Sequence, residues 1–289
     1  MRVNLPADLR AVLHTDLRWL GLAALVFLGA CSSAPQASLS PLALQALEAE
    51  TQGAQRYDQG QFDLAIRSFE LAQQLHRRVD DPAGVARNLT QQARSQLSAG
   101  RPQAALDALA TVPSPGADLL QLQATMALGD VAKVERLMPA VAQACPAACA
   151  DHAALRVLQA RWALSRAQPE QALAHAQAAV PLLQARQEHR ELANAWRLSA
   201  QAHGQLGATA LALQAANQAL TLDRSLGLPE RIAADWLLMG RLQHTSDPQQ
   251  ARAAYARAKD VALAAGLHGM VAQIDQIDQI APRLKETAP

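Results

Sequence analysis

The chain has 289 residues and a formal net charge of +1, and 50% of its residues are hydrophobic. That hydrophobic content excludes wholesale disorder, and the near-zero charge argues against a protein that wraps nucleic acid non-specifically. Aromatic residues make up only 3% of the chain, whereas alanine and leucine dominate it. The composition therefore favours helices over an all-β or a doubly wound α/β fold.

The first 30 residues have the composition of an export signal. Arginines and aspartates precede an unbroken apolar run from Trp19 to Ala30. This run is shorter than the roughly 20 residues that a membrane-spanning helix needs, and it ends in small residues, as secretory signal peptides do. The alternative is a core helix that ends in a buried cysteine.

The end of the apolar run carries a more specific pattern, from Leu28 through Gly-Ala to Cys31. It resembles the lipobox of bacterial lipoproteins, which implies cleavage before Cys31 and lipidation of this residue with acyl chains such as palmitate. Ser32 in the next position resembles an outer-membrane address. We therefore expect a signal peptide in residues 1–30, a lipidated cysteine and flexible tether in residues 31–41, and anchoring at the periplasmic face of a bacterial outer membrane.

Two further cysteines, Cys145 and Cys149, stand close together in the chain. In an oxidising periplasm such a pair is most simply a disulfide. Side-chain directions four residues apart in a regular helix suit a disulfide poorly, so Pro146 predicts a helix end or tight loop there. The spacing differs from the redox motif C-x-x-C, and no other histidine or cysteine has ligand spacing, which argues against redox catalysis and metal binding.

Residues 42–267 repeat a pattern whose clearest unit runs from Gly53 to Ala72. Within this unit, Gly60, Phe62 and Phe69 stand at the glycine and aromatic positions of the tetratricopeptide repeat, which the unit resembles. Small residues in that repeat allow two antiparallel helices to approach closely, and the glycine allows the turn between them. The resemblance implies helix hairpins stacked into a right-handed α-solenoid.

The same frame recurs six times. Its spacing is near 40 residues, longer than the usual 34 of the family, and one shorter interval marks a degenerate third unit. We predict an all-α, right-handed solenoid of about six such hairpins in residues 42–267, with an amphipathic capping helix in 268–289. An irregular all-α array of another repeat type is the alternative. The residues at the packing position of the second helices are Ala65, Ala105, Val134, Ala172, Ala212 and Ala251.

Prolines and glycines predict where helices begin and end. Pro82, Pro169 and Pro248 follow polar residues and suit the first position of a helix. Gly227 and Gly266 stand where helices are expected to end. These positions agree with the hairpin frame.

The sequence carries none of the common catalytic or phosphate-binding motifs. The eight histidines are scattered, and the adjacent pair Asp80 and Asp81 lies at a predicted helix start, where capping explains it. We therefore expect no catalytic residues, no metal, no cofactor and no enzymatic activity. An alternative from a different class of function is that the solenoid is the helical arm of a cell-wall-degrading enzyme. The sequence shows no catalytic domain after the repeats, which argues against it, and an assay of muropeptide release would test it.

In the tetratricopeptide family, defined positions of the first helices line a concave groove. Arginine recognises carboxylates through paired donors, so arginines at these positions would favour an acidic partner, although the Lys, Asn and Arg combination of the family's carboxylate clamps is absent. The alternative is that they are solvated helix surface. The matching positions are Tyr57, Asp58, Arg94, Arg161, Arg197, Gln201, Arg241 and His244.

The resemblance implies a function in protein binding. We expect an outer-membrane lipoprotein that uses a concave groove to bind an envelope protein or peptide as a scaffold or assembly factor. A pilotin-like factor for a secretin of a type IV pilus or secretion system, and an activator of a peptidoglycan synthase, are alternatives. The membrane is contacted through the lipid anchor, and no nucleic acid is expected.

Overall fold

The computed structural model describes residues 39–112 and 117–286. The expected signal peptide, Cys31 and nearly all of the tether lie outside these residues. The described part contains thirteen α-helices and no strand. They are α2 (Pro41–Asp58), α3 (Phe62–Arg78), α4 (Pro82–Ser98), α5 (Pro102–Leu109), α6 (Asp118–Ala127), α7 (Val131–Ala144), α8 (His152–Ser165), α9 (Pro169–Ala185), α10 (His189–Gln205), α11 (Thr209–Ser225), α12 (Pro229–Gln243), α13 (Pro248–Ala264) and α14 (His268–Glu286).

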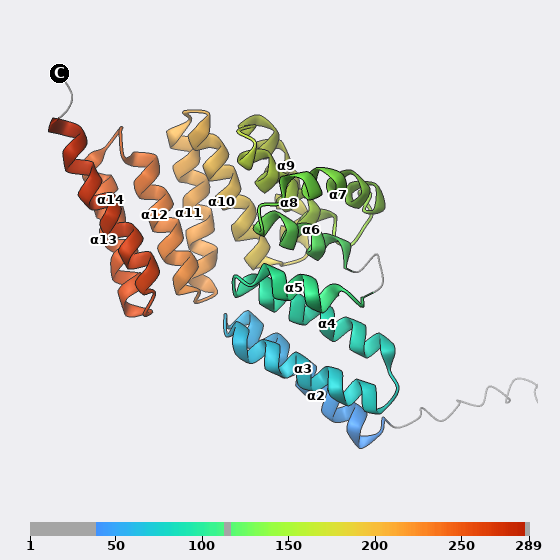
Figure 1. The fold of residues 1–289 in the computed structure, drawn as a ribbon. Helices are drawn as coiled ribbons and strands as arrows, with labels where there is room; N and C mark the ends of the chain where they lie inside the picture. Colours follow the sequence, from blue (N-terminus) through green and yellow to red (C-terminus); the bar gives the residue numbers. More distant parts are fainter. Residues whose placement is uncertain (1–38, 113–116, 287–289) are drawn as a thin grey trace, which may run out of the picture. The chain divides into compact units, whose positions relative to one another are not determined.

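Within the compact unit Leu42–Pro289, the helices follow one another as hairpins (Figure 1). The six hairpins, which we number in chain order, are α2–α3, α4–α5, α6–α7, α8–α9, α10–α11 and α12–α13, and α14 packs on α13. The predicted all-α solenoid of six hairpins with a capping helix is therefore confirmed. The third hairpin is built from short helices, of 10 and 14 residues, and Pro139 lies inside α7. This irregularity agrees with the short sequence interval at the third unit.

The packing position of every second helix is buried. Because each position is occupied by Ala or Val, the backbones of paired helices can approach closely. The residues concerned are Ala65, Ala105, Val134, Ala172, Ala212 and Ala251, each at most 1% exposed.

Two first-helix glycines mark still closer approaches. A Cβ atom on Gly53 would lie within 3.0 Å of three ring atoms of Phe69, and one on Gly240 equally close to the ring of Tyr255. The frame of small residues in the sequence therefore encodes the distance between the helices of a hairpin.

The hairpin turns depend on the left-handed backbone region. Gly60, Gly100 and Gly207 adopt φ angles of 74°, 72° and 74° at the turns, a region that glycine enters without steric cost. In the fourth hairpin Ala167 takes this place with φ 53°. The left-handed conformation costs a non-glycine residue roughly 1–2 kcal/mol, so the turn at Ala167 is strained whereas the glycine turns are not.

The predicted helix boundaries are also observed. Asp81 and Asp247 precede α4 and α13, and their side chains accept hydrogen bonds from the backbone N–H groups of Gly84 at 2.8 Å and Gln250 at 3.0 Å. Proline fills the first turn of both helices. The Asp–Pro pairs therefore act as helix starts, which explains Asp81 as a cap.

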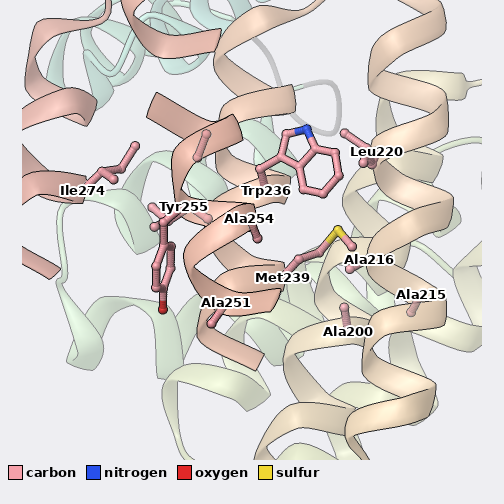
Figure 2. Packing of buried hydrophobic residues seen from close by; sticks show 12 residues of the cluster. Ala200, Ala215, Ala216, Leu220, Trp236, Met239, Ala251, Ala254, Tyr255 and Ile274 are labelled. Carbon is pink, nitrogen blue, oxygen red and sulfur yellow. The ribbon is translucent and has the colours of Figure 1, made fainter. Parts of the chain in front are cut away.

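The C-terminal hairpins surround a continuous hydrophobic cluster (Figure 2). Trp236 and Met239 of α12 and Tyr255 of α13 lie in it, and Ile274 of α14 is fully buried against the same cluster. The capping helix thus covers the apolar face that the sixth hairpin would otherwise expose.

Candidate functional site

A cavity of about 470 Å³ opens between the first two hairpins. It is lined by three of the residues predicted for the groove, Tyr57 and Asp58 at the end of α2 and Arg94 on α4. Phe69 of α3 lies at its apolar side. We call this space the groove cavity; its other lining residues are Glu50, Thr51, Ala54, Arg87, Asn88 and Gln91.

A buried polar network forms one wall of the groove cavity. Glu50 of α2 accepts hydrogen bonds from Asn88 of α4 and contacts Nε2 of His76 of α3 at 2.8 Å. Nδ1 of His76 lies 2.9 Å from a carboxylate oxygen of Asp81. His76 is 3% exposed and Asn88 1% exposed, whereas the carboxylates of Glu50 and Asp81 are partly exposed, so this network ties three helices together at the edge of the solvent.

The orientation of the Asn88 amide is set by its partners. Its Nδ2 group donates to Glu50 and to the backbone oxygen of Gly84, and both partners can only accept. The amide oxygen therefore points elsewhere, and it has no hydrogen-bond partner among the described residues. A buried acceptor without a donor is costly, so the two hydrogen bonds that Asn88 donates must offset this cost.

Charges of both signs surround this wall. The guanidinium of Arg87 lies 3.6 Å from Glu50 and 4.0 Å from Asp81. The pKa of Asp81 is lowered, chiefly by the hydrogen bond from the backbone of Gly84 and also by the charges of His76 and Arg87. Arg94 makes no hydrogen bond or ion pair with any described residue, so its five donors are available to a ligand.

A different arrangement surrounds Arg197, which the sequence predicted for the groove. Its Nε donates to Asp235 at 2.7 Å, and its Nη2 donates to Asp223. Both aspartates are fully buried, whereas the Arg197 side chain is 14% exposed. Arg197 is thus committed to an internal ion network between α10, α11 and α12.

Burial dominates the electrostatics of this network. It raises the pKa of Asp235 to about 6, and the charge of Arg197 opposes this while that of Asp223 adds to it. The pKa values of Arg161 and Arg231 are both lowered, in each case chiefly by desolvation. Arg161 keeps more than a third of its surface exposed and lies near Glu191 and Arg197 rather than in the groove cavity.

The remaining predicted groove residues lie on other first helices. Gln201 is half-buried on α10, and Arg241 is exposed in the last turn of α12. His244 directly follows α12, with its ring centroid 6.5 Å from that of Tyr255. The structure thus brings Tyr57, Asp58 and Arg94 into one cavity, while the other five predicted residues lie outside its lining.

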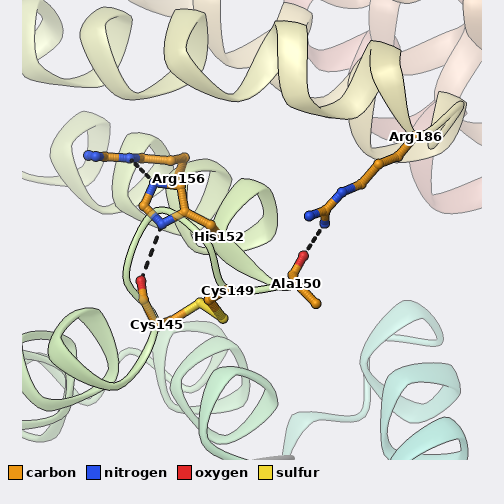
Figure 3. The surroundings of a disulfide bond; sticks show 6 residues. All are labelled: Cys145, Cys149, Ala150, His152, Arg156 and Arg186. Carbon is orange, nitrogen blue, oxygen red and sulfur yellow. Dashed lines mark hydrogen bonds between the residues drawn. A yellow bond between two sulfur atoms is a disulfide. The ribbon is translucent and has the colours of Figure 1, made fainter. Parts of the chain in front are cut away.

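The predicted disulfide residues meet between α7 and α8. Cys145 and Cys149 are joined, with their Cα atoms 5.1 Å apart. His152 Nδ1 lies 3.2 Å from the backbone oxygen of Cys145, and Arg156 Nε donates to His152 at 3.2 Å (Figure 3). Pro146 lies outside both helices, as the sequence indicated, so the disulfide staples a loop rather than a helix.

Sequence reasoning missed the polar wall of the cavity. Glu50, His76 and Asn88 stand at unremarkable repeat positions, and their pairing spans up to 38 residues of chain. The sequence signal that could have indicated this wall is a set of polar side chains at helix positions that face the core, of which His76 and Asn88 are buried in the structure. Within the described residues no group of three or more histidine, cysteine, aspartate or glutamate side chains is arranged to hold a metal ion.

The fold was compared with known proteins. No family model and no curated protein matches the chain. The crystal structure of the APC/C hetero-tetramer Cut9–Hcn1 matches with a TM-score of 0.59 and 16% identity, covering 80% of this chain and 43% of that one. The TPR2AB domain of yeast Sti1 in its pHSP90 complex matches with a TM-score of 0.39 and 16% identity, covering 82% and 98%.

These neighbours are tetratricopeptide-repeat proteins, and the likeness to the first of them extends to the fold. The present chain covers less than half of that neighbour's length. The fold is therefore an α-solenoid, similar to that of a tetratricopeptide-repeat protein. None of the described helices combines the length and the apolar character that crossing a membrane requires.

Proposed function

We propose that this protein is a scaffold that binds an extended segment of a partner protein in the groove cavity. The observation that carries the proposal is the guanidinium of Arg94, which has no hydrogen-bond or ion-pair partner among the described residues and lines the groove cavity together with the exposed residue Asp58. The cavity thus offers donors and a carboxylate acceptor within one space, and it lies where two first helices meet.

A polypeptide segment has the chemistry that this cavity requires. Its backbone N–H can donate to the carboxylate of Asp58, while backbone carbonyls or acidic side chains can accept from Arg94 and Arg87. Tyr57 and Phe69 provide an apolar surface for a side chain. The likeness of the fold to tetratricopeptide proteins supports this reading.

Comparing two charge reversals tests the site. Arg94→Glu places a carboxylate in the cavity, whereas Arg67→Glu makes the same change on α3, where Arg67 is exposed and lies outside the cavity lining. We expect affinity capture from native envelopes to lose a defined partner with Arg94→Glu and to retain it with Arg67→Glu. Retention by both variants would contradict the site, and loss by both would show an effect of net charge alone.

We further propose that the scaffold acts at the periplasmic face of an outer membrane, held by lipid on Cys31. The lipobox-like sequence supports this localisation, and confinement at a membrane raises the effective concentration of the groove toward envelope partners. Cys31→Ser should release the protein into the soluble periplasmic fraction. Membrane retention of this variant would overturn the anchor.

The identity of the captured protein separates the narrower roles. A secretin would select the pilotin-like role, and a peptidoglycan synthase the activator role. Genes adjacent to the one for this protein provide the same distinction before any experiment.

A further inference from the structure

Arg190, the second residue of α10, contacts the first hairpin of the solenoid. Its Nη2 group donates to the backbone oxygens of Asp58 at 2.8 Å and Tyr57 at 3.2 Å. Its guanidinium carbon also lies 5.2 Å from the ring centroid of Tyr57 and 6.0 Å from that of Phe62. One side chain of the fifth hairpin thus holds the end of α2 through backbone and aromatic contacts.

The chemistry of this contact suits a cation. Tyr57 and Asp58 are the last residues of α2, where backbone oxygens lack partners within the helix and carry the negative end of its dipole. Arg190 supplies donors and positive charge at that end, and the faces of both aromatic rings attract the same cation. The contact is therefore complementary in shape, hydrogen bonding and charge.

The first hairpin also lies close to the start of the sixth hairpin. The Cδ2 methyl of Leu228, directly before α12, lies 3.6 Å from where a Cβ on Gly60 would stand. Leu228 is 5% exposed. A second cavity, of about 570 Å³, is lined on one side by the turns at Gly60 and Gly100 and on the other by Glu230 of α12.

These contacts depart from the rule for solenoids, in which a repeat touches only its neighbours. Arg190 and Tyr57 are 133 residues apart, and three hairpins lie between the first and the fifth. We infer that the solenoid is closed on itself by a latch, formed by Arg190 against Tyr57 and Asp58, and that the latch regulates the groove cavity. The regulatory part rests on the proposed function, because it concerns the same cavity.

Tyr57 provides the coupling. Its ring lies under Arg190 and it also lines the groove cavity. The Tyr57 hydroxyl also lies 3.1 Å from the Ser98 hydroxyl of α4, within hydrogen-bond distance. Closure therefore adds a second restraint on one wall of the cavity, and opening removes that restraint. The third hairpin, with its short helices and Pro139 inside α7, is the segment between the two latched parts at which the chain can bend.

The two tyrosines of the chain allow a direct test of the contact. In protein labelled with 3-fluorotyrosine, Tyr57→Phe assigns the fluorine resonances, and Tyr255 serves as an internal reference. Arg190→Ala should shift the Tyr57 resonance toward its position in urea and leave that of Tyr255 unchanged. Arg186→Ala, which removes a nearby arginine that bonds Ala150 instead, should move neither. An unmoved Tyr57 resonance in Arg190→Ala would overturn the latch.

Crosslinking tests closure itself. In a Cys31→Ser chain with the native disulfide intact, the exposed residues Gln59 and His189 are replaced by cysteine and treated with a short bismaleimide. We expect efficient intramolecular crosslinking that falls several-fold with Arg190→Ala, with Arg190→Lys in between because lysine keeps the charge and loses the planar fork. Equal yields in all three would contradict closure by Arg190.

A thiol reagent tests the regulation of the cavity without any ligand. Gln91 is half-buried and lines the groove cavity from α4, whereas Gln52 of α2 is exposed outside it. Polyethylene-glycol maleimide should modify Gln91→Cys several-fold faster when Arg190→Ala is added, and Gln52→Cys at an unchanged rate. Unchanged modification of Gln91→Cys would overturn the regulation. These readouts use no partner, so they are distinct from a failure of partner binding.

Discussion

Replacing Gly240 by alanine tests the close helix approach on which the fold depends. Alanine in a helix interior is normally favoured over glycine by about 0.8–1.0 kcal/mol. At Gly240, however, the new methyl would lie within 3.0 Å of three ring atoms of Tyr255, a buried residue of the C-terminal cluster. Overpacking of this kind costs about 1–3 kcal/mol, so we expect a net loss of about 1 kcal/mol.

Two matched glycines separate the steric effect from helix propensity. Gly269 has no atom within 4 Å of an added Cβ and is the second residue of α14, so Gly269→Ala should stabilise the protein by about 0.5 kcal/mol, less than in a helix interior. Gly204 would meet only the Cδ2 tip of Leu242, which can move aside, so Gly204→Ala should be nearly neutral. Tyr255, by contrast, is 3% exposed and belongs to the buried cluster that Figure 2 shows.

Urea unfolding followed by far-UV circular dichroism measures all three variants. The expected order of unfolding free energy is Gly269→Ala above the unchanged chain, Gly204→Ala near it, and Gly240→Ala below it. If Gly240→Ala were as stable as Gly269→Ala, the helices of the sixth hairpin could not be as close as the structure has them, and the role given to small residues in the repeat would be wrong.

Three further predictions concern charge and the disulfide. Burial raises the pKa of Asp235 to about 6, so the folded protein holds this proton more tightly than the unfolded chain does. Protonated Asp235 therefore stabilises the fold fully below about pH 4, and this stabilisation is lost as the pH rises through about 6. The unfolding free energy of the unchanged chain, relative to Asp235→Asn at each pH, should therefore fall by up to about 3 kcal/mol between those limits, and a flat difference would refute the shift. Arg197→Met leaves two buried carboxylates without their cation and should destabilise the protein by about 3–5 kcal/mol; a loss below about 1 kcal/mol in urea titration would show that the network is solvated. Replacing Cys145 and Cys149 together by serine opens a short covalent loop and should cost about 2 kcal/mol, measured under oxidising conditions, with no difference expected once both proteins are reduced.

The fold was predictable because its signals are local and repeated. Ala65, Ala172 and Ala212 recur in one frame, and each is fully buried in the structure. Glycine turns and Asp–Pro helix starts act over a few residues, so the sequence pattern indicates them directly. The resemblance to the tetratricopeptide repeat then supplied the hairpin arrangement.

The site was predictable only in part. Family positions selected Tyr57, Asp58 and Arg94, which line one cavity in the structure, because these positions follow from the helix frame. Their role in binding stays a prediction. The same reasoning put Arg197 among them, although its guanidinium pairs with Asp223 and Asp235 from two other helices. Such partners depend on tertiary packing, and helical periodicity carries no information about them.

Long-range closure was beyond sequence reasoning for a related reason. Arg190 stands at a helix start like many other polar residues, and its partners are backbone oxygens, which every residue has. Only the path of the whole chain brings the end of α2 to Arg190. No local pattern distinguishes a latch from a solvated arginine.

Site-specific photocrosslinking tests the central claim, that the groove cavity binds a partner protein. A photoreactive phenylalanine analogue would replace Gln91, which lines the cavity, and, as a control, Gln74, which is exposed on α3 outside it. Irradiation of native envelopes should give one discrete adduct from position 91 that disappears with Arg94→Glu, and none from position 74. The same adducts from both positions, or none from position 91, would contradict binding in the cavity.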